Sequence, residues 1–198
     1  VAVTGVQTCA LPILEDIEFT AEDFIARVNS DLIGKYVNIA SRAAGFLASK
    51  FSGEVKCDGS WRARFSADET EREIRESFDG REYGRAIRCA MTFADRVNQF
   101  FDTQQPWSLA KQDSPEAQTK LQATCSDCIA AFHAMSVWLA PIIPRTTAAA
   151  ATFLGSGDAQ SWVSWQDVPK RIAQYQHLMN RVEEKQLDAL FEIGRAHV

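Results

Sequence analysis

Hydrophobic residues recur every three or four positions along most of the chain, a spacing that places them on one face of an α-helix. The first long run covers residues 21–51, and Thr20 before it is a good N-cap with Asp23 three positions later. The same spacing predicts further helices over 68–78, 82–103, 115–139, 148–154, 170–182 and 184–190. No alternating pattern typical of a β-strand is longer than a few residues, and nothing marks a second domain boundary. The pattern therefore predicts an all-α fold, a helix bundle.

Prolines, glycines and serines mark where the predicted helices end and begin. Gly53 ends the first helix, and Pro106 prevents the third from continuing, because proline has no backbone N–H and fixes φ. Ser114 and Pro115 form an N-cap followed by proline at the first helical position, and they open the next helix. The stretches between helices that are predicted to be loops are 57–66 and 156–169.

Composition and charge narrow the classes of function. Hydrophobic residues make up 46% of the 198 residues and charged residues 24%, which is enough apolar surface for a core. The formal net charge of -5 excludes a basic field over the whole molecule, so any contact with nucleic acid must come from a local patch. No stretch approaches the roughly 20 uncharged apolar residues of a membrane span, so we expect no membrane partner. Five cysteines do not make a disulfide scaffold in a chain of this length.

The two ends of the sequence are related at the level of DNA. Ile193–Val198 (IGRAHV) can be encoded by DNA whose complementary strand, read in another frame, encodes residues 8–12 (TCALP). Both ends therefore read as translated adapter DNA from a sequencing library, covering residues 1–13 and 192–198. We expect the biological segment to be residues 14–191, an internal piece of a larger protein.

Several blocks of residues occur in the order known from one family. The blocks are DFIARVNSD (23–31), GKYVNIASRAAGF (34–46), REYGRAI (81–87), QPW (105–107), AKQ (110–112), LAPIIP (139–144) and RVEEKQLDAL (181–190). Together they cover nearly all of residues 14–191. They resemble the anticodon-binding domain of bacterial methionyl-tRNA synthetases, in which the final helix matches the last block.

This resemblance implies a fold, a function and a set of partners. The fold is a helix bundle of the class I aminoacyl-tRNA synthetase anticodon-binding type, and its function is recognition of the methionine tRNA anticodon within an ATP-dependent methionine–tRNA ligase. The catalytic motifs of the family, of the types HIGH and KMSKS, and its zinc-binding cysteines are absent from this sequence. We therefore expect no catalytic residue, metal or cofactor in this chain, with ATP, magnesium and zinc belonging to a catalytic domain of the same parent. The implied location is the cytoplasm, with tRNA and not DNA as the partner.

Three residues are the candidates for anticodon recognition. Asn38 and Arg42 are four positions apart on one predicted helix, so they share a face, and both side chains suit the edges of unpaired bases. Trp107 follows a helix end, where its ring can stack on a splayed base. In the family that the sequence resembles, the matching residues contact the anticodon, and the tryptophan stacks on its first base. From the residues alone, a polar pair between helices and a core tryptophan explain the same pattern.

Basic residues on the same segments are candidates for contacts with tRNA phosphates. The three are Lys35, Arg88 and Lys111; the alternative is surface charge paired with neighbouring acidic residues. We expect the helices over 21–51 and 82–103 to be antiparallel neighbours that bring the anticodon-binding residues onto one surface.

Two other classes of function compete with this interpretation. Cys125 and Cys128 form a CxxC pair that suggests a thiol enzyme, but the pair lies inside a predicted helix, which favours core packing. His133 and His177 lie on predicted apolar helices and are expected to be structural. The second competitor is a helical protein–protein interaction module without an RNA role, which requires an exposed apolar groove.

Overall fold

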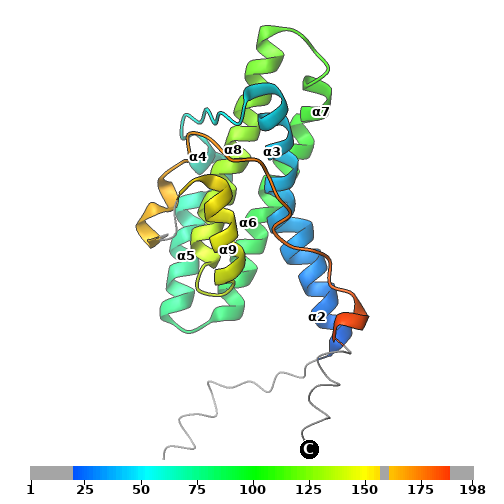
Figure 1. Cartoon of the computed structure of the whole chain (residues 1–198). Helices are drawn as coiled ribbons and strands as arrows, with labels where there is room; N and C mark the ends of the chain where they lie inside the picture. Colours follow the sequence, from blue (N-terminus) through cyan, green and yellow to red (C-terminus); the bar gives the residue numbers. More distant parts are fainter. Residues whose placement is uncertain (1–19, 157–160, 188–198) are drawn as a thin grey trace, which may run out of the picture. The chain divides into compact units, whose positions relative to one another are not determined.

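A computed structural model of the chain describes residues 20–156 and 161–187 (Figure 1). The predictions that residues 1–13 and 192–198 derive from adapter DNA fall outside these described residues. The fold is all-α over the part that is described: it contains helices and one isolated β-bridge, and no strand. The predicted fold class is therefore confirmed.

Two compact units make up the chain. Asn29–Arg181 forms the larger unit, and the two ends, Val1–Val28 and Val182–Val198, form the smaller one. In the smaller unit, α2 (Ala21–Arg27) begins where the sequence predicts, because the Thr20 side chain accepts a hydrogen bond from the backbone nitrogen of Asp23 at 3.3 Å. Residues 184–187 are helical, in agreement with the prediction for this segment.

Helices follow one another along the larger unit. Their bounds are η1 (Val28–Val37), α3 (Asn38–Phe51), α4 (Trp61–Phe65), α5 (Ala67–Asp79), α6 (Tyr83–Gln104), α7 (Pro106–Leu109), α8 (Pro115–Leu139), α9 (Pro144–Leu154) and η2 (Trp162–Gln166). The predicted run over 21–51 is helical throughout, but η1 has π-helical hydrogen bonding, which the spacing of apolar residues does not indicate. The predicted helix over 148–154 begins earlier than expected, at Pro144.

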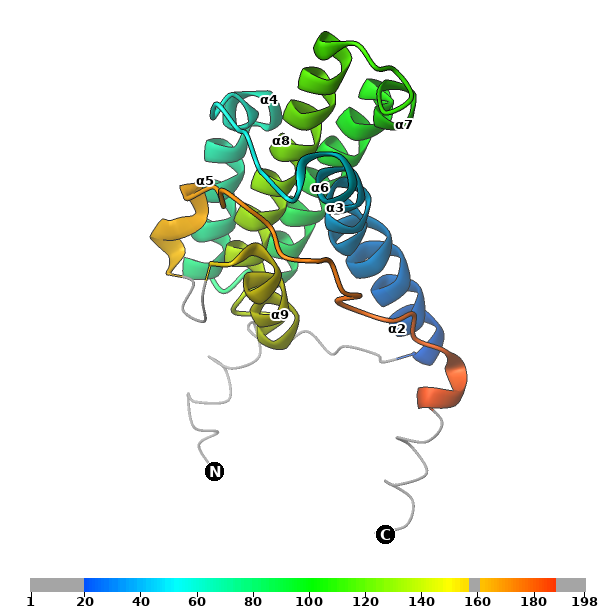
Figure 2. The ribbon, with the colours of Figure 1, turned by 45° about the horizontal axis from the view of Figure 1, so that its top comes forward.

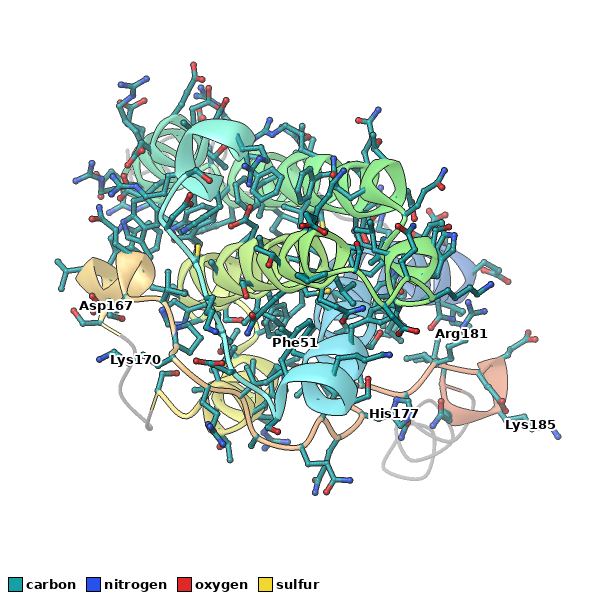
Figure 3. All side chains as sticks on the ribbon, turned by 90° about the horizontal axis from the view of Figure 1, so that it is seen from above. Phe51, Asp167, Lys170, His177, Arg181 and Lys185 are labelled. Carbon is teal, nitrogen blue, oxygen red and sulfur yellow. The ribbon has the colours of Figure 1, made fainter. Side chains whose placement is uncertain are left out.

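The central element of the larger unit is α8. Its start is as predicted, with the Ser114 hydroxyl oxygen accepting from the Ala117 nitrogen at 3.2 Å and Pro115 at the first helical position. Every residue from Thr124 to Leu139 is buried, so neighbours must cover the helix on all sides. Seen from above, α8 lies between the pair α5 and α6 and the pair α3 and α9 (Figure 3).

Two segments predicted to be loops contain short helices. Within 57–66, α4 carries Trp61 and Phe65, which are four positions apart and therefore share one face. Both side chains are buried in the core, so the expectation that they anchor this segment is confirmed while its loop assignment is wrong. Within 156–169, Trp165 of the 3-10 helix η2 is also buried and contacts the Trp61 ring edge-on.

The predicted helix over 170–182 is wrong: this segment is extended and crosses α9 and α3 (Figures 2 and 3). Its backbone bonds to distant segments, since Val55 N donates to Lys170 O, Ile172 N to Gly53 O and Ala173 N to Phe153 O, each at 2.9 Å. These bonds take backbone groups that a helix would pair within itself. His177 is consequently exposed in an extended segment and not on an apolar helix.

Candidate nucleic-acid interface

Side-chain contacts fix how η1 and α3 lie against α6. The contacting pairs are Lys35–Asp95, Asn38–Asn98 and Arg42–Asp102. In each pair the two residues are 60 positions apart, and only parallel helices keep such a constant separation. The prediction that these two helices are antiparallel is therefore wrong. The reason is α5, which runs back beside α6 and so reverses the chain between them (Figure 2).

Asn38 is partly buried where α3 meets α6. Its amide nitrogen Nδ2 donates to Oδ1 of Asn98 at 3.1 Å. No described residue donates a hydrogen bond to the other end of its amide, the Oδ1 atom. One polar atom of Asn38 is thus engaged within the protein, and the other is left as an acceptor.

Arg42 lies one helical turn further along α3. Its guanidinium forms an ion pair with Asp102 and lies over the Phe101 ring, 4.4 Å from the ring centroid. The Arg42 side chain is 28% exposed. A cation over an aromatic face is attracted by the ring electrons, so Phe101 and Asp102 together hold the guanidinium in place. Asp102 is its only acceptor among the described residues, which leaves further N–H donors for a ligand.

Trp107 is placed by the turn at the end of α6. Gln105 takes a left-handed conformation with φ of 49°, and Pro106 then starts the single turn α7. The indole is 42% exposed, and its ring centroid lies 6.4 Å from that of Phe101. The expectation that this tryptophan projects from a helix end is confirmed, and the alternative of a core tryptophan is not. Part of the ring contacts Phe101, and part is reachable from solvent.

The structure therefore joins Arg42 and Trp107, while Asn38 shares a face of α3 with Arg42 one helical turn away. Phe101 is the common neighbour, because it contacts both the Arg42 guanidinium and the Trp107 ring. Sequence reasoning missed the residues that hold this surface together: Asn98, Phe101 and Asp102. Apolar spacing places Phe101 on the inner face of its helix, but only the register between α3 and α6 shows what it supports.

The candidate phosphate contacts differ in whether an acidic side chain already neutralises their charge. Lys35 is bound by Asp95 at 3.0 Å and by Asp31 at 3.4 Å, and the hydrogen bond to Asp95 raises the pKa of its ammonium group. Lys111 is exposed, follows Trp107 by four positions and forms no ion pair with the described residues. The charge of Lys111 is therefore available to a ligand, whereas that of Lys35 is already compensated.

Arg88 lies apart from this surface. It is exposed near the start of α6, about 20 Å along the helix from Asp102 at 1.5 Å per residue. It lines a hollow between α5 and α6 together with Arg85, which pairs with Glu82 at 3.0 Å. The structure does not bring Arg88 together with the recognition residues.

The CxxC pair does not form a reactive thiol site. Cys125 and Cys128 are both completely buried in the middle of α8. Burial raises the pKa of the Cys125 thiol to about 12 and that of Cys128 well above its usual value. Thiols held neutral in this way are poor nucleophiles, so the thiol-enzyme alternative is contradicted.

His133 is also part of the core. Its side chain is 1% exposed, and Nε2 donates to the carbonyl oxygen of Ser164 at 2.9 Å. This bond ties α8 to η2, in agreement with the structural role expected from the sequence.

Two other kinds of site, a metal cluster and a membrane-spanning helix, do not occur in the described residues. Among them, no three or more His, Cys, Asp and Glu side chains gather in a way that could hold a metal ion. No helix within 20–156 and 161–187 is long and apolar enough to cross a membrane.

Comparisons with known proteins show what the chain is similar to, first in fold and then in sequence. The chain has a helical fold that also occurs in methionyl-tRNA synthetase of Mycobacterium tuberculosis. The free state of that protein superimposes with a TM-score of 0.75 at 20% identity, over 83% of this chain and 35% of that one. Methionine–tRNA ligase of Neisseria meningitidis serogroup C is 43% identical over 189 residues, covering 93% of this chain. The ligase of Azoarcus sp. strain BH72 is 43% identical over 185 residues. The chain is therefore homologous to a part of the methionyl-tRNA synthetases.

The match covers only part of each relative. The chain spans 27% of the Neisseria ligase and 25% of the Azoarcus ligase. No family profile matches the chain. The proteins that the chain matches are methionine–tRNA ligases.

Proposed function

We propose that the chain recognises the anticodon of methionine tRNA, which reads CAU because it pairs with the AUG codon. The observation that carries this proposal is the contact of both Arg42 and Trp107 with Phe101, with Asn38 one helical turn from Arg42 on the same face of α3. Its chemistry fits unpaired nucleotides, since it combines an exposed aromatic face with hydrogen-bond donors and an acceptor beside it. The 43% identity to methionine–tRNA ligases supports the choice of tRNA.

Each residue has a distinct task in this proposal. Trp107 stacks on the first anticodon base, which is cytosine. Arg42 donates to acceptor atoms on a base edge, and Asn38 offers the amide atom that the protein does not use. Lys111 contacts a backbone phosphate near Trp107, and Arg88 reaches a phosphate only if the RNA extends along α6.

The proposed role is recognition without chemistry in this chain. A catalytic domain of the same parent would join methionine to the tRNA in the cytoplasm, and ATP, magnesium and any zinc would belong to that domain. We propose no contact with DNA or with a membrane.

A binding experiment with the whole chain tests the proposal. The probe is an RNA hairpin with the CAU anticodon loop, compared with a hairpin of the same stem and a scrambled loop. Replacing Trp107 with Ala removes a stacking face worth about 1–3 kcal/mol, so affinity for the CAU hairpin should fall about ten- to a hundredfold. Tyr83→Ala is the control, because Tyr83 is an aromatic residue at the opposite end of α6 that is also exposed, 54% against 42% for Trp107. It should leave the affinity unchanged.

Equal affinity of the unmodified chain for both hairpins would contradict the proposal. Such a result would favour the alternative, a protein–protein interaction module. Equal losses for Trp107→Ala and Tyr83→Ala would show that aromatic residues anywhere on the surface bind RNA without selecting a site.

A further inference from the structure

The side chain of Asn98 on α6 lies between the backbone of two helices and the side chain of Asn38. Its Nδ2 donates to the carbonyl oxygen of Ala94 at 2.9 Å and to that of Lys35 at 3.1 Å. Its Oδ1 accepts from Nδ2 of Asn38 at 3.1 Å. Asn98 therefore uses both ends of its amide inside the protein.

The chemistry of these neighbours dictates the orientation of both amides. A carbonyl oxygen can only accept, so the atom of Asn98 that faces Ala94 and Lys35 must be the NH₂ group. Its Oδ1 must then face Asn38, and because that oxygen can only accept, Asn38 must turn its own NH₂ group inward. Two backbone carbonyls thus determine, through Asn98, which atom of Asn38 remains for a ligand.

The atom that remains is Oδ1 of Asn38, a hydrogen-bond acceptor to which no described residue donates. An amide without such a constraint can present either its oxygen or its nitrogen, since the two ends have nearly the same shape. Cytosine carries an amino group, a donor, at the position where uracil carries a carbonyl oxygen, an acceptor. A fixed acceptor on the protein therefore favours cytosine, whereas a freely rotating amide accommodates both bases.

We propose that Asn98 is a positioning residue that fixes the Asn38 amide with its oxygen available, so that the surface selects cytosine over uracil. This inference rests on the proposed function, and it adds the device that decides between two pyrimidines. Asn98 is not expected to contact the RNA, because its donors and its acceptor are engaged by Ala94, Lys35 and Asn38.

The test compares two RNA hairpins that differ only in the first anticodon base, CAU and UAU, with the whole chain as the binding protein. Asn98→Leu keeps the size of the side chain and removes the acceptor. It should reduce the preference for CAU over UAU about two- to tenfold, the range expected for one net hydrogen bond. Most of that change should be tighter binding of UAU, because the freed Asn38 amide can turn its donor outward.

Asn98→Asp is the informative companion, because a carboxylate still accepts from Asn38 but cannot donate to the two carbonyls. Asn98→Asp should keep most of the preference for CAU, even if it melts at a lower temperature than Asn98→Leu. If Asn98 had only a structural role, the variant with the lower melting temperature would lose more of the preference. If Asn98→Leu does not fold, Asn98→Ala serves as the variant without an acceptor.

A double-mutant cycle shows whether Asn98 acts through Asn38. In an Asn38→Ala background, Asn98→Leu should leave the CAU/UAU ratio unchanged, since there is no amide left to orient. Additive effects of the two substitutions on the CAU/UAU ratio would overturn the inference. So would a CAU/UAU ratio that Asn98→Leu alone leaves unchanged, or a preference for CAU that falls equally in Asn98→Leu and Asn98→Asp. If Trp107→Ala weakens binding but the unmodified chain does not distinguish CAU from UAU, the proposed function stands and the role of Asn98 is refuted. If the chain does not bind either hairpin above the scrambled loop, the proposed function itself fails.

Discussion

The ammonium group of Lys35 lies 3.0 Å from a carboxylate oxygen of Asp95, whereas Lys111 has no such partner among the described residues. A lysine that is already paired with an acid releases fewer counterions when RNA arrives than one that is free. The two lysines therefore serve as a matched pair for measuring phosphate contacts. The two side chains are both lysines and differ in whether an acid is paired with them.

Replacing Lys111 with Gln should weaken binding of all hairpins alike and reduce the slope of log affinity against log salt by about 0.7, the value for one phosphate contact on a single strand. Lys35→Gln should change that slope by much less, because its charge is compensated by Asp95 and Asp31. The measurement is a salt titration of hairpin binding from low to physiological ionic strength. Equal slopes for the two variants would contradict the assignment of Lys111 to a phosphate.

A second prediction concerns the contact between Gly53 and the extended segment over residues 170–182. A Cβ atom on Gly53 would lie 2.6 Å from the carbonyl oxygen of Ile172, which is too close for any side chain. Gly53 also has φ of 76°, a conformation that costs other residues about 1–2 kcal/mol. Replacing it with Ala should therefore lower the free energy of unfolding by more than this strain alone, because the hydrogen bond from Ile172 N to Gly53 O must also shift.

Gly59→Ala is the control for that experiment. Gly59 has a similar φ of 87°, but no heavy atom lies within 4 Å of the position its Cβ would take. Its substitution should cost only the conformational strain, about 1–2 kcal/mol. Denaturant unfolding of both variants measures the difference. A loss for Gly53→Ala no larger than for Gly59→Ala would show that the extended segment contributes little to stability.

The third prediction concerns pH. Burial lowers the pKa of His133 below its usual value of about 6.5, while the hydrogen bond to Ser164 and the charge of Asp167 act in the opposite direction. The unfolded chain therefore takes up a proton at this residue near pH 6.5, and the folded chain does so only at lower pH. The stabilising contribution is complete above pH 6.5 and declines as the pH falls through that value towards the folded pKa.

His133→Gln should remove this part of the pH dependence, since glutamine can still donate to Ser164 and does not titrate. The thermal midpoint of the unmodified chain should therefore fall more between pH 7.5 and 5.5 than that of the variant. His177→Gln is the control, because it removes a histidine from an exposed position outside the core. A variant profile parallel to that of the unmodified chain would assign the acid sensitivity to other groups.

The sequence predicts local features of this fold better than features that join distant segments. Thr20 and Ser114 were predicted as N-caps and are so, because capping depends on residues two or three positions away. The extended segment over 170–182 was missed because its apolar residues have helical spacing, and its backbone partners lie on Gly53, Val55 and Phe153. No local signal shows that these distant groups are available.

The candidate site divides in the same way. The resemblance to a known family suggested Asn38, Arg42 and Trp107, and the structure places Arg42 and Trp107 on either side of a shared neighbour, Phe101. It could not identify Asn98 or Phe101, because their importance depends on the parallel register of α3 and α6, a property of the packed helices. Neither the periodicity of apolar residues nor the spacing of motifs shows which residue of one helix contacts which residue of another.

In the proposed function, that register affects how accurately an anticodon is read. The contacts of Lys35, Asn38 and Arg42 with α6 keep the reading side chains of α3 at a fixed height beside Trp107. A slip of one helical turn would move them by about 5.4 Å, which exceeds the separation of about 3.4 Å between stacked bases. In the proposed function, the polar groups would then face a different nucleotide from the one that the tryptophan holds. Choosing the correct amino acid for a codon would thus depend on three side chains of α6, Asp95, Asn98 and Asp102, to which no contact with RNA is assigned.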